Sequence, residues 1–189
     1  MATFEKCDES VRQMADELLK EFETHKPTLD AGVTIDFVFA YAPKDEHGNP
    51  TGDALSHGGY PALGICRKIP LKDRVLGRGD VEISLDGDWW GNASHEEQRA
   101  LLDHELHHIV PKQEGTNTAG KPVFKVDAAG RPVIGMRKHD YNFGWFKDIA
   151  ARHGKHSQER KQAAGMMEEG GQYFWPSIGF AAPSNLRAA

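Results

Sequence analysis

The sequence predicts an α+β fold: a packing helix, a small and mostly antiparallel sheet, a helix lying across that sheet, a β-hairpin and a final helix. Strands are predicted at 33–41 and 80–85, where apolar and polar residues alternate, and at 62–69 between them. Helices are predicted at 7–25 and 94–110, where apolar residues recur at helical spacing.

The first helix is predicted from Cys7 to His25, and Pro27 is expected to end it. Charged residues separate the apolar ones, which leaves one face free to pack. The apolar residues are Val11, Met14, Ala15, Leu18, Leu19 and Phe22. This pattern is typical of a helix that covers a core and has no chemical role.

The predicted strands are joined by segments with loop composition. Residues 44–59 contain Asp, Gly, Asn and Pro throughout, which predicts a loop. In 80–85 the three aliphatic residues face one way, as expected of a strand with one buried face. Residues 86–88 are predicted to form a turn, and Trp89 and Trp90 after it are expected to cover the core.

The helix at 94–110 has the clearest signals. Ser94 followed by Glu97 forms a capping box, in which each side chain bonds the other residue's backbone N–H. No Gly or Pro follows until Pro111, which is expected to stop the helix. An apolar side is expected to pack on the core, and it consists of Leu102, Leu106, Ile109 and Val110.

The second half of the chain is predicted to hold a hairpin and a helix. Two β-like runs, Pro122–Val126 and Pro132–Met136, flank the loop 127–131, whose Gly130 can take positive φ. A helix is predicted from Tyr141 to His153. Asp140 suits its N-cap and Gly154 its C-cap. We expect a single domain over residues 1–165, followed by an irregular C-terminal tail, 166–189.

Charge and cysteine content exclude several classes of protein. The formal net charge of −5 provides no global basic field to attract nucleic acid. A local basic run could contact phosphate, although such runs more often protect a strand edge, so nucleic acid is a weakly supported partner. That run is Arg67, Lys68, Lys72, Arg74 and Arg78.

The two cysteines, Cys7 and Cys66, exclude a disulfide framework and a Cys-rich zinc ribbon. They fit a reducing cytosol, and a cytoplasmic location is expected. No long apolar run or signal-peptide pattern is present, so neither secretion nor membrane spanning is expected.

The helix at 94–110 contains the pattern H-E-x-x-H at His104, Glu105 and His108. Residues four apart lie on the same helix face, so the two imidazoles can point at one metal ion. Glu105 lies about 100 degrees round the helix from His104, where its carboxylate can act as a general base on a water at the metal. The pattern therefore predicts a zinc site.

A catalytic zinc site takes three protein ligands and keeps one position open. His139 is the best candidate for the third ligand, because it follows a hairpin that could return the chain and precedes a predicted helix. Asp140, His57, Glu82 and His153 are the alternatives. His107 points away from the face of His104 and His108, so a supporting or surface position is expected; Asp103 is similar.

These residues carry a resemblance to zincin metallopeptidases. The segment His104–His108, followed by His139-Asp140-Tyr141-Asn142-Phe143 before a helix, resembles the phage metallopeptidase family and, more distantly, the SprT-like proteases. The resemblance covers roughly 81–154. The SprT-like family has Gly after the third His, where this chain has Asp140, and no DNA-binding tail is visible.

The resemblance implies a zincin-like fold with Zn²⁺ held by His104, His108 and His139. It implies hydrolysis of a protein or peptide substrate lying along a sheet edge, with Glu105 activating a zinc-bound water, and a phage or prophage origin. Such enzymes usually add a donor for the oxyanion. Tyr141, Arg137 and His107 are candidates for that donor, and Asp140 could orient the site.

Two alternatives belong to other classes. The run His107-His108-Ile109-Val110-Pro111 resembles part of an HNH nuclease, but that motif needs its His on a β-hairpin instead of in a long helix. The chain could also be a non-catalytic zinc-binding interaction module. A structural site more often uses Cys, and the presence of Glu105 favours catalysis.

Overall fold

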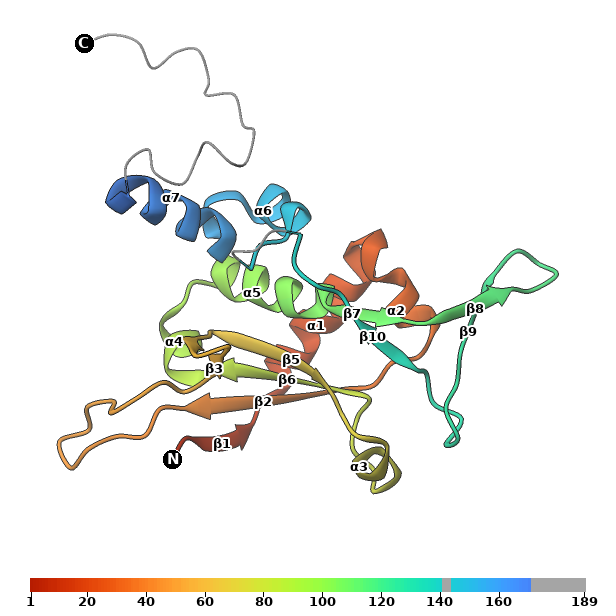
Figure 1. Ribbon diagram of the computed structural model, residues 1–189, viewed down its shortest axis with the longest axis horizontal. Coiled ribbons are helices and arrows are strands. Elements are labelled where there is room, and N and C mark those ends of the chain that lie inside the picture. The colour runs from red at the N-terminus through yellow and green to blue at the C-terminus, as the bar shows by residue number, and fades with distance from the viewer. Residues whose placement is uncertain (141–143, 171–189) are drawn as a thin grey trace, which may run out of the picture.

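The computed structural model of the chain describes residues 1–140 and 144–170 (Figure 1). It confirms a mixed α+β fold with a small, mostly antiparallel sheet. The strand order is β1-β2-β6-β5, and only the β2–β6 pair is parallel. The bounds are β1 Thr3–Lys6, β2 Ile35–Tyr41, β5 Gly64–Lys68 and β6 Val81–Asp86.

Helices α1 (Glu9–Glu21) and α5 (His95–His107) pack against each other and cover one face of this sheet (Figure 1). The core between them is aliphatic and aromatic. Its members with no exposed surface are Val11, Leu18, Val81, Ile83, Leu85, Leu102 and Leu106. The predicted apolar faces of the first helix and of 80–85 are therefore confirmed. The other face of β6 is covered as well, because Glu82 and Ser84 are also buried.

The N-terminal elements differ from the prediction in two ways. Strand β1 was not predicted, and its four residues are all exposed at the sheet edge. Asp8 caps α1 by accepting from the backbone N–H of Ser10 and Val11. Pro27 does not end this helix: a 3-10 turn (η1, Glu23–His25) and a short helix (α2, Lys26–Asp30) follow, and the missing N–H of proline is tolerated in a first turn.

The loop and turn predicted around β5 and β6 contain more structure than expected. Within 44–61, β3 (Ser56–His57) pairs with β4 (Tyr60–Pro61). Residues 86–88 are not a simple turn, because Asp86 accepts from the N–H of Trp89 at 3.0 Å and starts helix α4 (Gly87–Asn92). Trp90 in this helix is buried in the core, as predicted.

Helix α5 begins as predicted and ends early. Ser94 and Glu97 form the reciprocal capping box. The prediction that the helix reaches Val110 is wrong, because α5 ends at His107 and the chain becomes strand β7 (Ile109–Pro111). β-Branched residues suit a strand, and here β7 pairs antiparallel with β10 (Ile134–Met136).

The predicted hairpin is wrong in its pairing. Strand β9 (Pro122–Phe124) pairs with β8 (Gln113–Thr116), a segment that was predicted to be a polar loop. Strand β10 pairs with β7 instead, and the two predicted strands meet only at an isolated bridge between Val126 and Pro132. The loop between them does carry Gly130 at φ 73°, as expected.

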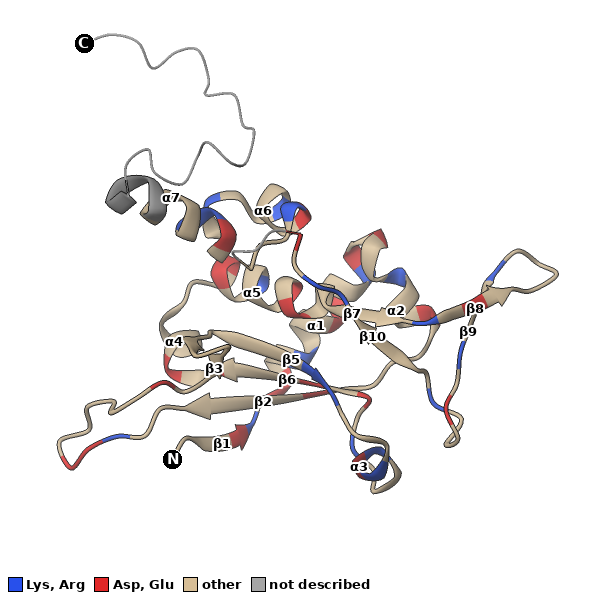
Figure 2. Cartoon of the chain, in the orientation of Figure 1, with Lys and Arg blue, Asp and Glu red and all other residues tan. Residues whose placement is uncertain are grey.

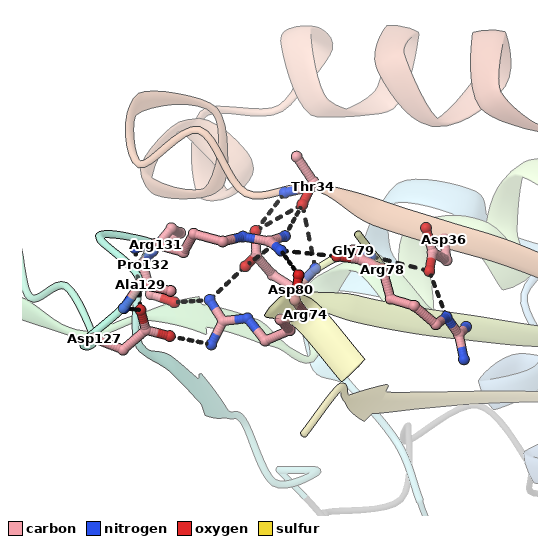
Figure 3. Close-up of polar contacts among 10 residues, drawn as sticks. All are labelled: Thr34, Asp36, Arg74, Arg78, Gly79, Asp80, Asp127, Ala129, Arg131 and Pro132. Carbon is pink, nitrogen blue, oxygen red and sulfur yellow. Dashed lines mark hydrogen bonds and ion pairs between the residues drawn. The ribbon is translucent and has the colours of Figure 1, made fainter. Parts of the chain in front are cut away.

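A polar cluster fixes this loop to the end of the sheet (Figure 3). Arg74 contacts both Asp80 and Asp127, and its bond to Asp127 is 2.7 Å long. Arg131 binds Asp80 at 3.0 Å. Asp80 is 1% exposed and also accepts from the N–H of Thr34 at 2.8 Å. These contacts hold the segment that leads into β10 and onward to His139.

The last predicted helix begins later than expected. Residues 141–143 lie outside the described residues, and α6 covers Lys147–His153 instead of starting at Tyr141. Gly144 has φ 80°, which a regular α-helix does not accommodate. Asp140 is not an adjacent N-cap, but its carboxylate accepts from the N–H of Lys147 at 3.1 Å.

After α6, Gly154 ends the helix at φ 52°, as predicted. The chain continues through η2 (Gly154–His156) into α7 (Gln158–Gly170). The division into a domain 1–165 and a tail 166–189 stays a prediction. No described helix has the length and apolar character needed to cross a membrane.

Candidate metal centre

Three histidines from two distant segments meet at the C-terminal end of α5. His104 and His108 come from successive turns at the end of this helix, and His139 comes from the irregular segment after β10. One ring nitrogen of each lies within 4.8 Å of the others. Nε2 of His104 and Nε2 of His139 are 3.1 Å apart. Nitrogens around a tetrahedral zinc lie about 3.3 Å apart, so this spacing fits such an ion.

The opposite ring nitrogens have partners that fix how the imidazoles point. Nδ1 of His104 lies 2.5 Å from a carboxylate oxygen of Glu159, and Nδ1 of His108 lies 2.8 Å from the backbone carbonyl of Arg137. When Nδ1 donates a hydrogen bond, the lone pair is on Nε2. In His104 that nitrogen faces His139.

The aromatic ring of Phe146 packs against all three imidazole rings. Its side chain has no exposed surface, and its ring centroid lies 4.9 Å from those of His104, His108 and His139. The residue precedes α6 in an extended conformation, which aims the ring inward. No motif in the sequence marks Phe146 for this position.

Burial keeps two of the three histidines neutral in the metal-free protein. It lowers the pKa of His108 to about 3 and that of His139 to about 4. Burial also acts against protonation of His104, but the bond to Glu159 and the charge of Glu105 outweigh it and raise the pKa of His104. Neutral imidazole is the form that binds metal.

Glu105 lies beside the triad, between α5 and the edge strand β5. Its side chain is 3% exposed, and one of its carboxylate oxygens is buried with no hydrogen-bond partner. A backbone hydrogen bond from Cys66 reaches this carboxyl group. Burial raises the pKa of Glu105 to about 7. An orphaned buried oxygen is costly, which suggests a partner absent from the chain itself.

Gly64 makes room for this carboxylate. A Cβ atom at position 64 would lie 2.5 Å from an oxygen of Glu105 and 2.8 Å from its carboxyl carbon. Any larger residue would therefore displace the Glu105 side chain. The requirement is steric, because Gly64 has no positive φ.

The triad and Glu105 line one cavity of about 540 Å³. Its walls are the edge of β5, the side of α5 that carries His104 and Glu105, the segment Met136–His139 and the start of α7. His57, one of the alternative ligands, lies on the rim and is not within the triad. Glu82 lies elsewhere, paired with Arg67 and Arg78 at 2.5 Å each.

The other predicted site residues lie around the triad. His107, the last residue of α5, is buried and does not line the cavity. It contacts the guanidinium of Arg137 and the rings of Phe146 and His25. Arg137 thus supports both His107 and, through its carbonyl, His108. Asp140 ties the backbone to α6. Tyr141 lies outside the described residues.

Two carboxylates near the site were missed or misjudged. Glu159 was not predicted at all, because 152–161 has only a mixed basic composition and no motif. Asp103, expected in a supporting or surface position, is fully buried. It binds His25 at 2.6 Å, His153 at 2.7 Å and Arg152 at 3.0 Å.

Three comparisons with known proteins bear on this site. No curated protein and no solved structure matches the chain at a significant level. Residues 3–169 match the family described as "Putative phage metallopeptidase". That match spans the whole described sheet and the three histidines, and the sequence resemblance is thereby confirmed. The chain belongs to the putative phage metallopeptidase family.

Proposed function

We propose that the chain is a zinc-dependent peptidase of zincin type, in which His104, His108 and His139 hold the metal and Glu105 is the general base. One observation carries the proposal: a buried carboxylate oxygen without a partner lies beside three inward-facing imidazoles in one cavity. A structural zinc site is closed and needs no such group.

Each residue has a role that follows from its position. A zinc ion bound by the triad would polarise the scissile carbonyl and lower the pKa of water to about 7. Glu105 takes the proton of the attacking water and passes it to the leaving amine. Its pKa of about 7 in the metal-free protein suits a group that gains and loses a proton near neutral pH.

The substrate is proposed to lie in extended form along β5. This strand is last in the sheet order, so its outer edge has no neighbouring strand in the sheet. The same edge forms a wall of the cavity beside Glu105. An extended peptide can add to such an edge through main-chain hydrogen bonds. A cytoplasmic location and a phage or prophage origin stay predictions.

Metal content tests the ligand set. Elemental analysis of the purified chain is expected to give one zinc per chain, and His139→Ala should lose it. His57→Ala is the matched control, since His57 lines the same cavity outside the triad. A His139→Ala variant that keeps full zinc would refute the assignment of the third ligand.

Cleavage of a peptide library then tests the reaction. The zinc-loaded chain should cut peptides, and Glu105→Gln should keep zinc and lose cleavage. Zinc binding without cleavage by the wild type would favour the non-catalytic interaction module. No observation favours the nuclease, because His107 is buried and held by Arg137 and Phe146 instead of facing the cavity.

A further inference from the structure

The strands β8 and β9 form an arm that projects from the body of the molecule (Figure 1). We define the β8–β9 arm as residues 112–125. All residues of β8 are exposed, and only Phe124 of β9 is half-buried. A two-stranded ribbon with no core of its own is marginally stable in water. The arm therefore adds little to the stability of the fold. A contact with a binding partner outside the molecule would give it a role.

The arm lies in a basic part of a chain that is acidic overall. Residues 109–138 contain six Lys or Arg and two Asp or Glu, whereas the rest of the chain contains 17 and 26. Figure 2 shows blue segments, which mark Lys and Arg, along the β8–β9 arm. Lys112, Lys121 and Lys125 are all exposed on the arm. In the part of the chain that the structure describes, the lysines paired with a carboxylate lie elsewhere; they are Lys26, Lys44 and Lys161.

Two of these lysines are neighbours across the ribbon's base. The N–H of Lys125 donates to the carbonyl of Lys112 at 2.8 Å, so both side chains leave adjacent backbone segments. Like charges on neighbouring strands repel each other. Lysines can protect an exposed edge from pairing with other chains, and that role needs no anion. A polyanionic partner would instead relieve the repulsion.

Local contacts define the shape of the arm at both of its ends. At its tip the side chain of Asn117 accepts from the N–H of Ala119 and Lys121, each at 3.0 Å, and Gly120 has φ 75°. At its base, the loop 127–131 is held by the ion pair between Asp127 and Arg74 (Figure 3). A pre-formed shape reduces the entropy lost on binding.

We propose that the β8–β9 arm binds duplex DNA through contacts of Lys112, Lys121 and Lys125 with backbone phosphates. The major groove is roughly 12 Å wide and admits a two-stranded β-ribbon. Its phosphates offer closely spaced charges to each exposed lysine. The basic run at 67–78 is less suited, because Arg67, Arg74 and Arg78 are paired with carboxylates. This surface is independent of the proposed peptidase reaction.

Fluorescence anisotropy with a labelled mixed-sequence duplex, over a series of salt concentrations, tests the proposal. The wild type should bind at low salt. A triple variant with Lys112, Lys121 and Lys125 changed to Gln should bind weakly, and the slope of log K against log salt should fall by about 3. The matched control changes three exposed lysines of other elements, Lys6, Lys20 and Lys155, to Gln.

Three outcomes would overturn the proposal: no binding by the wild type at low salt, equal losses in both triple variants, or binding of polyglutamate without binding of DNA. The last would identify an acidic protein as the partner. Unchanged thermal unfolding of the arm variant shows that the fold is intact. His108→Ala should bind DNA as the wild type does, so failure of the metal centre and failure of the arm are distinguishable.

Discussion

Helix α5 carries two buried carboxylates, two residues apart, in opposite surroundings. Asp103 has no exposed surface and binds His25, His153 and Arg152. Burial acts to raise the pKa of Asp103, but these partners outweigh it and hold that pKa well below its usual range. Glu105 is 3% exposed and has one oxygen without a partner, and burial raises its pKa to about 7.

Burial is common to Asp103 and Glu105, so the presence or absence of charged partners decides how they differ. Asp103 connects α5 to η1 and α6, so its charge stabilises the packing of the helices behind the site. Glu105 forms no comparable ion pair within the described chain and faces the cavity. Pairs of carboxyl groups with pKa values driven apart by their surroundings are typical of active sites.

The largest expected effect is on the rate of peptide cleavage by Glu105→Gln. Loss of a general base should lower kcat by about 10²- to 10⁴-fold, since Gln cannot take a proton. The variant should still fold to the same structure, because Gln keeps the shape of the side chain without its charge. Peptide cleavage measures the loss of rate, and circular dichroism of the same variant checks that its structure is retained. A cleavage rate within tenfold of the wild type would refute the role of Glu105.

Asp103→Asn should act on stability, in contrast to Glu105→Gln, which should act on the cleavage rate. Removing the charge leaves Arg152 and two histidines without their carboxylate, which should lower the free energy of unfolding by about 3–5 kcal/mol. Urea unfolding of the metal-free protein measures this. Asp148→Asn, on the exposed side of α6, is the control and should change stability by less than about 0.5 kcal/mol. A loss as small as the control's would mean that the Asp103 cluster is not structural.

The parts of this site that were predictable from sequence are local. The capping box of Ser94 and Glu97 and the four-residue spacing of His104 and His108 depend only on helix geometry, so the pattern was sufficient. His139 was predicted from its chemistry and position after a returning segment, and the structure places it in the triad. Its predicted position at a helix start was wrong, because α6 begins at Lys147.

The parts that sequence could not supply depend on contacts between distant segments. Glu159 reaches His104 across 55 positions, and no motif marks it. The end of α5 at His107 is decided by pairing of β7 with β10, a partner 23 or more residues further along the chain. Periodicity cannot reveal which strand pairs with which, so tertiary contacts overrode the helical pattern there.

The pH dependence of stability tests the difference between Glu105 and Asp103 in an experiment that needs no substrate. In the metal-free protein the pKa of Glu105 is raised from 4.5 to about 7, so the folded state binds more protons than the unfolded state between these values. Stability should therefore fall as pH rises through this window, by about 3 kcal/mol in total. Glu105→Gln should remove this fall.

Urea unfolding of both proteins between pH 4 and pH 8, with a chelator present, measures the difference. The contribution of Asp103 has the opposite sign, because its pKa is lowered: it is present above the usual pKa of Asp and is lost in stronger acid. The two effects thus occupy separate pH ranges. Parallel curves for the wild type and Glu105→Gln would show that folding does not raise the pKa of Glu105.

The smallest expected effect concerns Glu159, a buried carboxylate near the site that combines features of Asp103 and Glu105. It is 3% exposed, as Glu105 is, yet it is paired, as Asp103 is, through a 2.5 Å contact with Nδ1 of His104.

Carboxylates in this position orient a ligand imidazole and increase its basicity, and losing one typically weakens metal binding about 10- to 100-fold. Glu159→Gln should therefore raise the Kd for zinc by this factor, measured by competition with a chromogenic chelator. Gln162→Ala, on the same helix and lining the same cavity, should leave the Kd unchanged. If Glu159→Gln binds zinc as tightly as the wild type, its carboxylate serves the packing of α7 on α5, and of the three carboxylates only Glu105 would belong to the chemistry.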